Sequence, residues 1–163
     1  MLWQFDLVWS LAQLHLDALA DADFFWEPAE LTWTVRRGDD GAWRPDFSEV
    51  EPDPIPVPTI AWLSWHIDWW WTAALDAAQG RPRSELQWSG TGAAAVARIR
   101  ELAVQWRALL ADLDEPALSR PVPYPWDPPK TLAHLVSWVN IELTKNIAEI
   151  GQLRLLRAAT SAG

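Results

Sequence analysis

Apolar residues recur at intervals of three and four positions along four stretches of the chain, which is the spacing of a helix with one buried face. These stretches cover residues 2–20, 60–79, 93–113 and 131–158. Thr59 and Gly80 flank the second stretch, as an N-cap and a C-terminal glycine flank a helix. No strand-like alternation of comparable length occurs. The pattern therefore predicts an all-α fold, a four-helix bundle.

Two proline-rich connections interrupt this pattern, at residues 21–58 and 114–130. The first is long for a compact domain, and such connections are usually functional or disordered. Residues 32–36 and 42–44 flank a glycine-rich turn and are expected to form a small hairpin. Aromatic anchors argue against disorder, so we expect the connection to fold over one end of the bundle as a lid. These anchors are Trp26, Trp33, Trp43 and Phe47.

The helix predicted over 131–158 carries a polar stripe that spans an arc of roughly 80°. The stripe consists of His134, Trp138, Glu142, Lys145 and Glu149. Apolar positions flank it, so the sequence predicts that it faces inward. A buried ion costs several kcal/mol unless it is paired, binds metal or loses its charge. The stripe is therefore a candidate functional site.

A histidine on the second predicted helix can face this stripe. His66 lies in the segment WLSWHIDWWW, in the middle of an aromatic arc. If the two helices pack antiparallel, His66 and Glu149 come to the same level. The chain has 14 tryptophans among 163 residues, and one or two beside His66 are expected to line a small-molecule pocket. The candidate pocket residues are Trp62, Trp69, Trp70, Trp138 and His134.

Charge and composition exclude several classes of function. The net charge is −9, which repels phosphate backbones and anionic lipid headgroups, so we expect neither nucleic acid nor membrane as a partner. The absence of cysteine excludes disulfides and a protein thiol nucleophile, so any thiol chemistry needs an external thiol. Neither a signal peptide nor a membrane span is recognisable, and we expect a cytoplasmic protein.

Three motifs together resemble the DinB/YfiT-like superfamily of four-helix bundles, in particular its tryptophan-rich actinobacterial branch. They are IAWLSWHIDWWW, FFWEPAELTWTVR and WVNIELTKNIAEIGQLRLLR, and the similarity covers nearly the whole chain as one domain, residues 1–163. Members with the full pattern hold a divalent metal through three histidines. Some act as thiol-dependent transferases or isomerases that use mycothiol, bacillithiol or glutathione. The resemblance places His66 at the first ligand position, and Lys145 and Glu149 at the other two.

Lysine at a ligand position departs from the family pattern, because a protonated ammonium has no lone pair and repels a cation. We therefore expect no tightly bound metal, and His66 and Glu149, with or without Glu142, to hold a divalent ion only weakly. Two interpretations of Lys145 stay open. As a counter-ion it neutralises Glu149 and Glu142, and its removal strands a buried carboxylate at a cost of roughly 3–5 kcal/mol. Alternatively, Lys145, His66, Glu149 and Glu142 form a catalytic acid/base set at the floor of the pocket.

Two classes of function follow from these interpretations. The first is an accessory or sequestering protein that binds a hydrophobic or aromatic small molecule at a degenerate metal site. The second is a metal-independent acid/base enzyme, or a thiol-dependent transferase or isomerase, that acts on a hydrophobic small metabolite. The broken histidine set favours the first class, and the retained charged groups favour the second. A homodimer is compatible with the sequence but not required by it.

Overall fold

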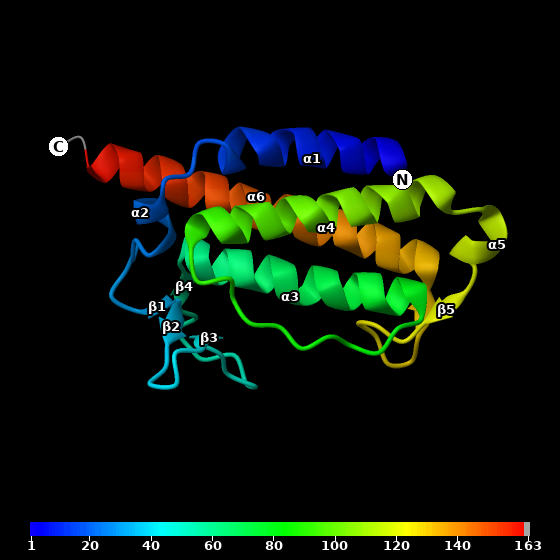
Figure 1. Ribbon diagram of the computed structural model, residues 1–163, viewed down its shortest axis with the longest axis horizontal. Helices are drawn as coiled ribbons and strands as arrows, with labels where there is room; N and C mark the ends of the chain where they lie inside the picture. The colour runs from blue at the N-terminus through cyan, green and yellow to red at the C-terminus, as the bar shows by residue number, and fades with distance from the viewer. Residues whose placement is uncertain (162–163) are drawn as a thin grey trace.

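The computed structural model describes residues 1–161 and is predominantly helical, as predicted. The four long helices are α1 (Leu2–Leu16), α3 (Ile60–Gln79), α4 (Gly92–Asp112) and α6 (Leu132–Thr160), and the short ones are α2 (Asp21–Phe24) and α5 (Glu115–Leu118). The long helices contact one another in a ring, α1 with α6, α6 with α3, α3 with α4 and α4 with α1 (Figure 1). Helices α3 and α6 run in opposite directions (Figure 1). No helix within residues 1–161 is long and apolar enough to cross a membrane.

Local capping sets the ends of the helices. The Thr59 hydroxyl accepts a hydrogen bond from the Trp62 amide at 3.2 Å, and Gly80 ends α3 in a left-handed conformation with φ 66°. Helix α1 stops at Leu16, four residues before the predicted end. The reason is a second helix start, because the Asp23 carboxylate accepts from the Ala20 amide at 2.7 Å and begins α2. The apolar pattern continues across this break, so periodicity alone does not reveal it.

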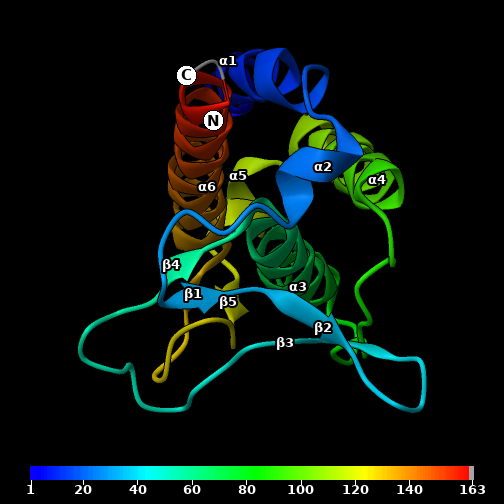
Figure 2. The ribbon, with the colours of Figure 1, turned by 90° about the vertical axis from the view of Figure 1, so that its left-hand side faces the viewer.

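Three short two-stranded ladders lie within residues 1–161. Strands β1 (Thr32–Trp33) and β4 (Val57–Pro58) pair in parallel, β2 (Val35–Arg37) and β3 (Trp43–Pro45) pair antiparallel, and β5 (Pro121–Val122) and β6 (Lys130–Thr131) pair antiparallel. The β2–β3 hairpin turns at residues 38–41, where Gly41 adopts φ 80°. The first two ladders lie together beside the start of α3 (Figure 2). They give the 21–58 connection a defined structure against the helices.

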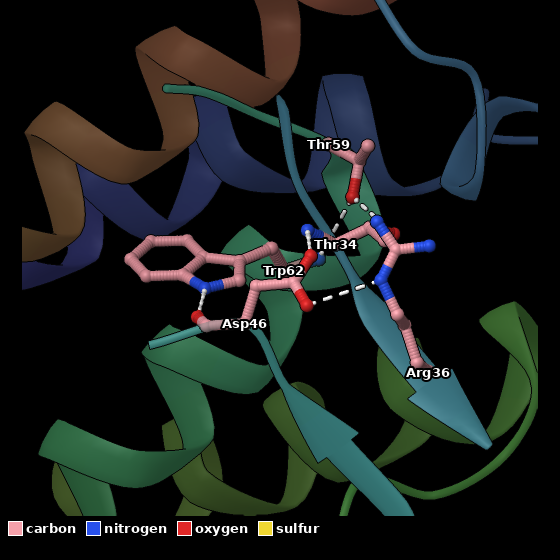
Figure 3. A network of polar contacts seen from close by, with 5 residues as sticks. All are labelled: Thr34, Arg36, Asp46, Thr59 and Trp62. Carbon is pink, nitrogen blue, oxygen red and sulfur yellow. Dashed lines mark hydrogen bonds and ion pairs between the residues drawn. The ribbon is translucent and has the colours of Figure 1, made fainter. Parts of the chain in front are cut away.

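Asp46 joins this connection to α3 (Figure 3). Its carboxylate accepts from the Thr34 amide at 3.0 Å and from Arg36 Nε at 3.1 Å. Its backbone carbonyl accepts from Trp62 Nε1 at 2.8 Å. The Thr59 hydroxyl also donates to the Thr34 hydroxyl at 3.1 Å in a buried position. These bonds hold the hairpin at a fixed place beside the first turns of α3.

Three of the four predicted aromatic anchors pack against the core: Trp26, Trp33 and Trp43. Trp33 stacks on Trp62 with ring centroids 5.2 Å apart. The prediction for Phe47 is wrong, because its side chain is 62% exposed. Phe47 follows the β3 strand beyond the last ladder pair, where no element covers it.

Most of the tryptophans serve packing. Of the 14 in the chain, 13 lie in the core or pack against it, and Trp3 is the exception at 77% exposed. Trp70, Trp71 and Trp106 are fully buried between the long helices. The large rings therefore fill the bundle and hold its connections, and only a few remain to line a surface.

Candidate functional site

The part of α3 around His66 is aromatic: Trp62 and Trp65 are buried, and His66 and Trp69 are partly exposed. The His66 ring stacks on Trp62 with centroids 4.8 Å apart and an interplanar angle of 13°. Trp69 lies on the other side, 6.0 Å away at 27°. Trp62 is itself fixed, because its indole N–H donates to the Asp46 carbonyl. The imidazole is therefore held between two indole rings.

His66 is neutral at pH 7. Burial lowers the pKa of its imidazole to about 4, and the charge of Lys145 on α6 adds to this effect. A neutral imidazole offers one N–H donor and one acceptor nitrogen. The face of α3 thus presents one uncharged polar group among aromatic rings, next to a cation.

Lys145 lies at the rim of the site and not inside the bundle. Its ammonium pairs with the Glu142 carboxylate at 2.7 Å, and its side chain is 50% exposed. His134 is also exposed, while Trp138, Glu142 and Glu149 are half-buried. The prediction that the polar stripe faces inward is therefore wrong. Helix α6 is rotated so that the stripe borders the bundle surface, where water solvates the ammonium.

Glu149 is separated from Lys145 by its hydrogen bonding. Its carboxylate accepts from Asn146 Nδ2 at 2.9 Å, and the ammonium pairs with Glu142 instead. Glu149 also lines a hollow of about 490 Å³ together with Val57 and Leu153, and Lys145 does not line this hollow. The expected neutralisation of Glu149 by Lys145 is therefore wrong, while the expected pairing of Lys145 with Glu142 is present.

Lys145→Met is expected to lower the free energy of unfolding by about 1 kcal/mol or less, because a rim ion pair contributes little. It should also raise the pKa of His66, since the charge that now opposes imidazole protonation is removed. Urea unfolding and an NMR titration of the His66 ring measure the two effects. Lys130→Met is the matched control, because Lys130 lies over the Trp126 ring and should leave His66 unchanged. If Lys145→Met lowered the free energy of unfolding by 3 kcal/mol or more, the interpretation of Lys145 as a buried counter-ion would be restored.

The structure adds two residues that the sequence did not single out. The Arg83 guanidinium lies 4.8 Å from the Trp69 ring centroid and 5.9 Å from that of Tyr124. Burial raises the pKa of Tyr124 to about 12, with Arg83 opposing the rise and Glu142 adding to it. Tyr124 also packs edge-on against Trp138 at 5.7 Å. Both residues lie in loops without periodicity, so no pattern in the sequence points to them.

The predicted pocket residues do not line one common pocket. Trp70 is 1% exposed, and its indole N–H donates to the Asn146 side chain at 3.0 Å, so its assignment to a pocket wall is wrong. The turn of α3 directs Trp70 at α6 and not at a cavity. Trp138 and His134 line a hollow of about 340 Å³ beside Trp126. His134 also contacts the Thr131 hydroxyl at 2.7 Å at the start of α6.

A larger cleft of about 830 Å³ is lined by Trp65 and Trp69 but not by His66, and these two rings stack 5.8 Å apart. The β2–β3 hairpin supplies one wall through Trp43 and Arg44. The other wall is the segment 83–87 of the α3–α4 connection, which runs back along α3 (Figure 1). Trp69 is the only predicted pocket residue that lines this cleft within residues 1–161.

The side chains of His66, Lys145 and Glu149 do not fit a tightly held divalent metal. Within residues 1–161, no three His, Cys, Asp or Glu side chains gather closely enough to hold an ion. The Lys145 ammonium has no lone pair. Its positive charge lowers the pKa of His66, and the same charge repels a metal ion next to the imidazole. Glu149 is engaged by Asn146. His66 therefore lacks the partners that a structural or catalytic metal requires.

A family model described as the DinB superfamily matches residues 4–150 of the chain. The match spans α1 to most of α6 and includes both His66 and Lys145. It confirms the resemblance at the level of the superfamily. No curated protein matches the chain.

Proposed function

This chain belongs to the DinB superfamily, and we propose that it binds a hydrophobic or aromatic small molecule on the tryptophan-lined side of α3 without a tightly bound metal. We further propose that the chain is a single domain with a DinB-type four-helix bundle, since its long helices contact one another in a closed ring. The bundle acts as a rigid frame, and the lid and the α3–α4 connection shape the binding surface.

The neutral His66 between two indole rings is the observation that carries this proposal. Aromatic walls with one or two oriented polar groups are the usual composition of a small-molecule site. The partly exposed Trp69 supplies apolar contact area at little entropic cost, because an indole has two side-chain torsions. His66 supplies the directional hydrogen bond.

The low pKa of His66 favours binding over acid/base catalysis. A general base works best when its pKa lies near the operating pH, and a pKa of about 4 makes the imidazole a weak base at pH 7. The rim position of Lys145 and the engagement of Glu149 by Asn146 also separate the proposed catalytic set. A degenerate site that binds and does not turn over is therefore the better-supported function.

NMR of the histidine rings tests the proposal, because the chain has only three histidines. We expect 2-naphthylmethanol, a neutral flat probe, to shift the His66 ring signal in a saturable manner. His15 on α1 is the internal control and should not move. His66→Gln assigns the signal and should weaken binding by roughly 5- to 30-fold if one hydrogen bond is lost, which corresponds to about 1–2 kcal/mol.

Two results would contradict the proposed function. One is a His66 signal that stays unmoved by aromatic probes at millimolar concentration. The other is a stoichiometric change in that signal on addition of zinc that persists against a chelator, which would restore a metal site. A low-molecular-weight thiol, added alone and with the naphthyl probe, tests the transferase class in the same samples.

A further inference from the structure

The cleft between the β2–β3 hairpin and the segment 83–87 contains an arginine that the protein leaves uncommitted. We propose that this cleft binds a flat aromatic or conjugated monocarboxylate, with the aromatic side chains that line it as apolar contacts and Arg83 as the partner of the carboxylate. The inference rests on the proposed function, because both place an aromatic ligand against Trp69, but His66 does not line the cleft and the carboxylate site is therefore a separate claim. The volume of the cleft, about 830 Å³, is within the range of small-molecule sites.

The other arginines near the cleft are already paired. Arg44 on the hairpin wall binds the Asp40 carboxylate through two hydrogen bonds of 2.9 and 2.6 Å. Arg81 binds Asp76 through two bonds of 3.0 and 2.8 Å. Within residues 1–161, no carboxylate lies within 4.0 Å of the Arg83 guanidinium, although the chain has 22 acidic residues. Arg83 is therefore free to bind an external anion.

The Arg83 guanidinium is held next to two aromatic rings. It lies over the Trp69 ring at 4.8 Å, with the Tyr124 ring at 5.9 Å. Stacking on an indole occupies one flat side of the guanidinium and leaves its N–H edge available. A carboxylate accepts two parallel hydrogen bonds from such an edge. An aromatic acid can thus contact the aromatic lining of the cleft and reach the arginine in the same pose.

The wall formed by the segment 83–87 is anchored at both ends before any ligand binds. Asp76 is 2% exposed and accepts from Arg81 and from the Ser84 amide at 2.9 Å. Burial alone would raise the pKa of Asp76, but the hydrogen bonds from Ser84 and Arg81 outweigh it and lower the pKa. At the far end of the segment, Trp88 Nε1 donates to the Ser64 hydroxyl at 2.9 Å. A wall fixed at both ends loses little entropy on binding, which favours affinity.

The hairpin wall is anchored to the same segment by aromatic contacts. Trp43 packs edge-on against Trp88 with centroids 5.1 Å apart, and both contact Phe25. The hairpin wall therefore keeps its position relative to the segment 83–87. Flat rings make more contact with aromatic walls than saturated rings do.

The charge of the cleft favours one negative group. Glu85 also lines it, and Arg44 is neutralised by Asp40, so Arg83 is the one uncommitted cation among the residues that line the cleft. A dianion such as a phosphate monoester would face Glu85 with a single counter-charge. A monocarboxylate needs only Arg83, and it is the anion that this arrangement matches.

Isothermal titration with three probes tests the inference on the full-length protein. The probes are 2-naphthoate, the neutral 2-naphthylmethanol with the same rings, and cyclohexanecarboxylate with the same charge on a ring that is not flat. We expect 2-naphthoate to bind at least about 10-fold more tightly than either of the other two, because it combines stacking with charge-assisted hydrogen bonds.

Arg83→Gln should reduce the preference for 2-naphthoate over 2-naphthylmethanol to about 2-fold or less. Arg83 is exposed and outside the core, so this variant should fold like the wild type. Arg44→Gln is the matched control, since Arg44 lines the same cleft but is bound by Asp40, and it should keep the preference. Trp69→Leu should weaken both naphthyl probes and also reduce the preference for 2-naphthoate, because Arg83 loses the ring that holds it.

The outcomes separate this inference from the proposed function. If 2-naphthylmethanol binds and shifts His66 but the acid binds no more tightly, the carboxylate site is wrong and the proposed function stands. The same conclusion follows if Arg83→Gln retains the preference or if Arg44→Gln abolishes it. If neither naphthyl probe binds at millimolar concentration, the proposed function fails, and the carboxylate site fails with it.

Discussion

Trp70→Ala is expected to lower the free energy of unfolding by about 3–5 kcal/mol, the usual cost of removing a buried aromatic side chain. Trp70 is 1% exposed, packs on Trp71 at 5.6 Å and contacts Trp138 edge-on at 5.6 Å. Its removal leaves a cavity between α3 and α6 and also an unpaired Asn146 side-chain oxygen. Urea unfolding followed by circular dichroism measures the change.

Two further variants separate the contributions to this effect. Trp70→Phe keeps most of the ring but removes the N–H donor, so it should cost about 1–3 kcal/mol through the buried Asn146 oxygen. Trp3→Ala removes a tryptophan that is 77% exposed and should stay within about 0.5 kcal/mol of the wild type. A Trp70→Ala protein as stable as the Trp3→Ala protein would mean that Trp70 lines a pocket after all.

Acidification is expected to destabilise the protein through His66, by an amount on the order of 3 kcal/mol for its full titration. The pKa of the imidazole is about 4 in the fold, against 6.5 as the ordinary value. Between these values the unfolded chain binds more protons than the folded one, so stability rises with pH across this window. The contribution is complete above pH 6.5 and is lost as the pH falls through 4.

The measurement compares wild type with His66→Phe from pH 7 to pH 4. Carboxylates also titrate in the lower part of this range, so the relevant quantity is the difference between the two proteins. His66→Phe should become more stable relative to the wild type as the pH falls, because the wild type must protonate a buried ring. Parallel curves for the two proteins would mean that the His66 ring is solvated in the folded state.

The ends of α3 could be predicted because they depend on neighbours in the sequence. Thr59 caps the first turn with its own hydroxyl, and Gly80 adopts the left-handed conformation that a side chain disfavours. Helical periodicity likewise identified the four long helices and placed His66 among aromatic rings. These features need information from only a few consecutive residues.

The partners of individual side chains could not be predicted in the same way. On a helical wheel, Trp69 and Trp70 flank His66 almost equally, yet Trp69 lines a cleft and Trp70 is buried against α6. The packing of α3 against α6 decided this, and the same packing left Lys145 at the rim. A wheel gives the angle between residues on one helix, but the neighbouring helices determine which angle is buried.

The sequence by itself determined the helical architecture, the superfamily and the position of the neutral histidine. Only the tertiary structure decided that Lys145 pairs with Glu142, and that Arg83 stacks on Trp69 without a carboxylate partner. The cleft brings together Trp43, Trp69 and Arg83 from three separate segments. Such a site depends on how connections fold back onto α3, because contacts between distant segments leave no periodic signal in the sequence.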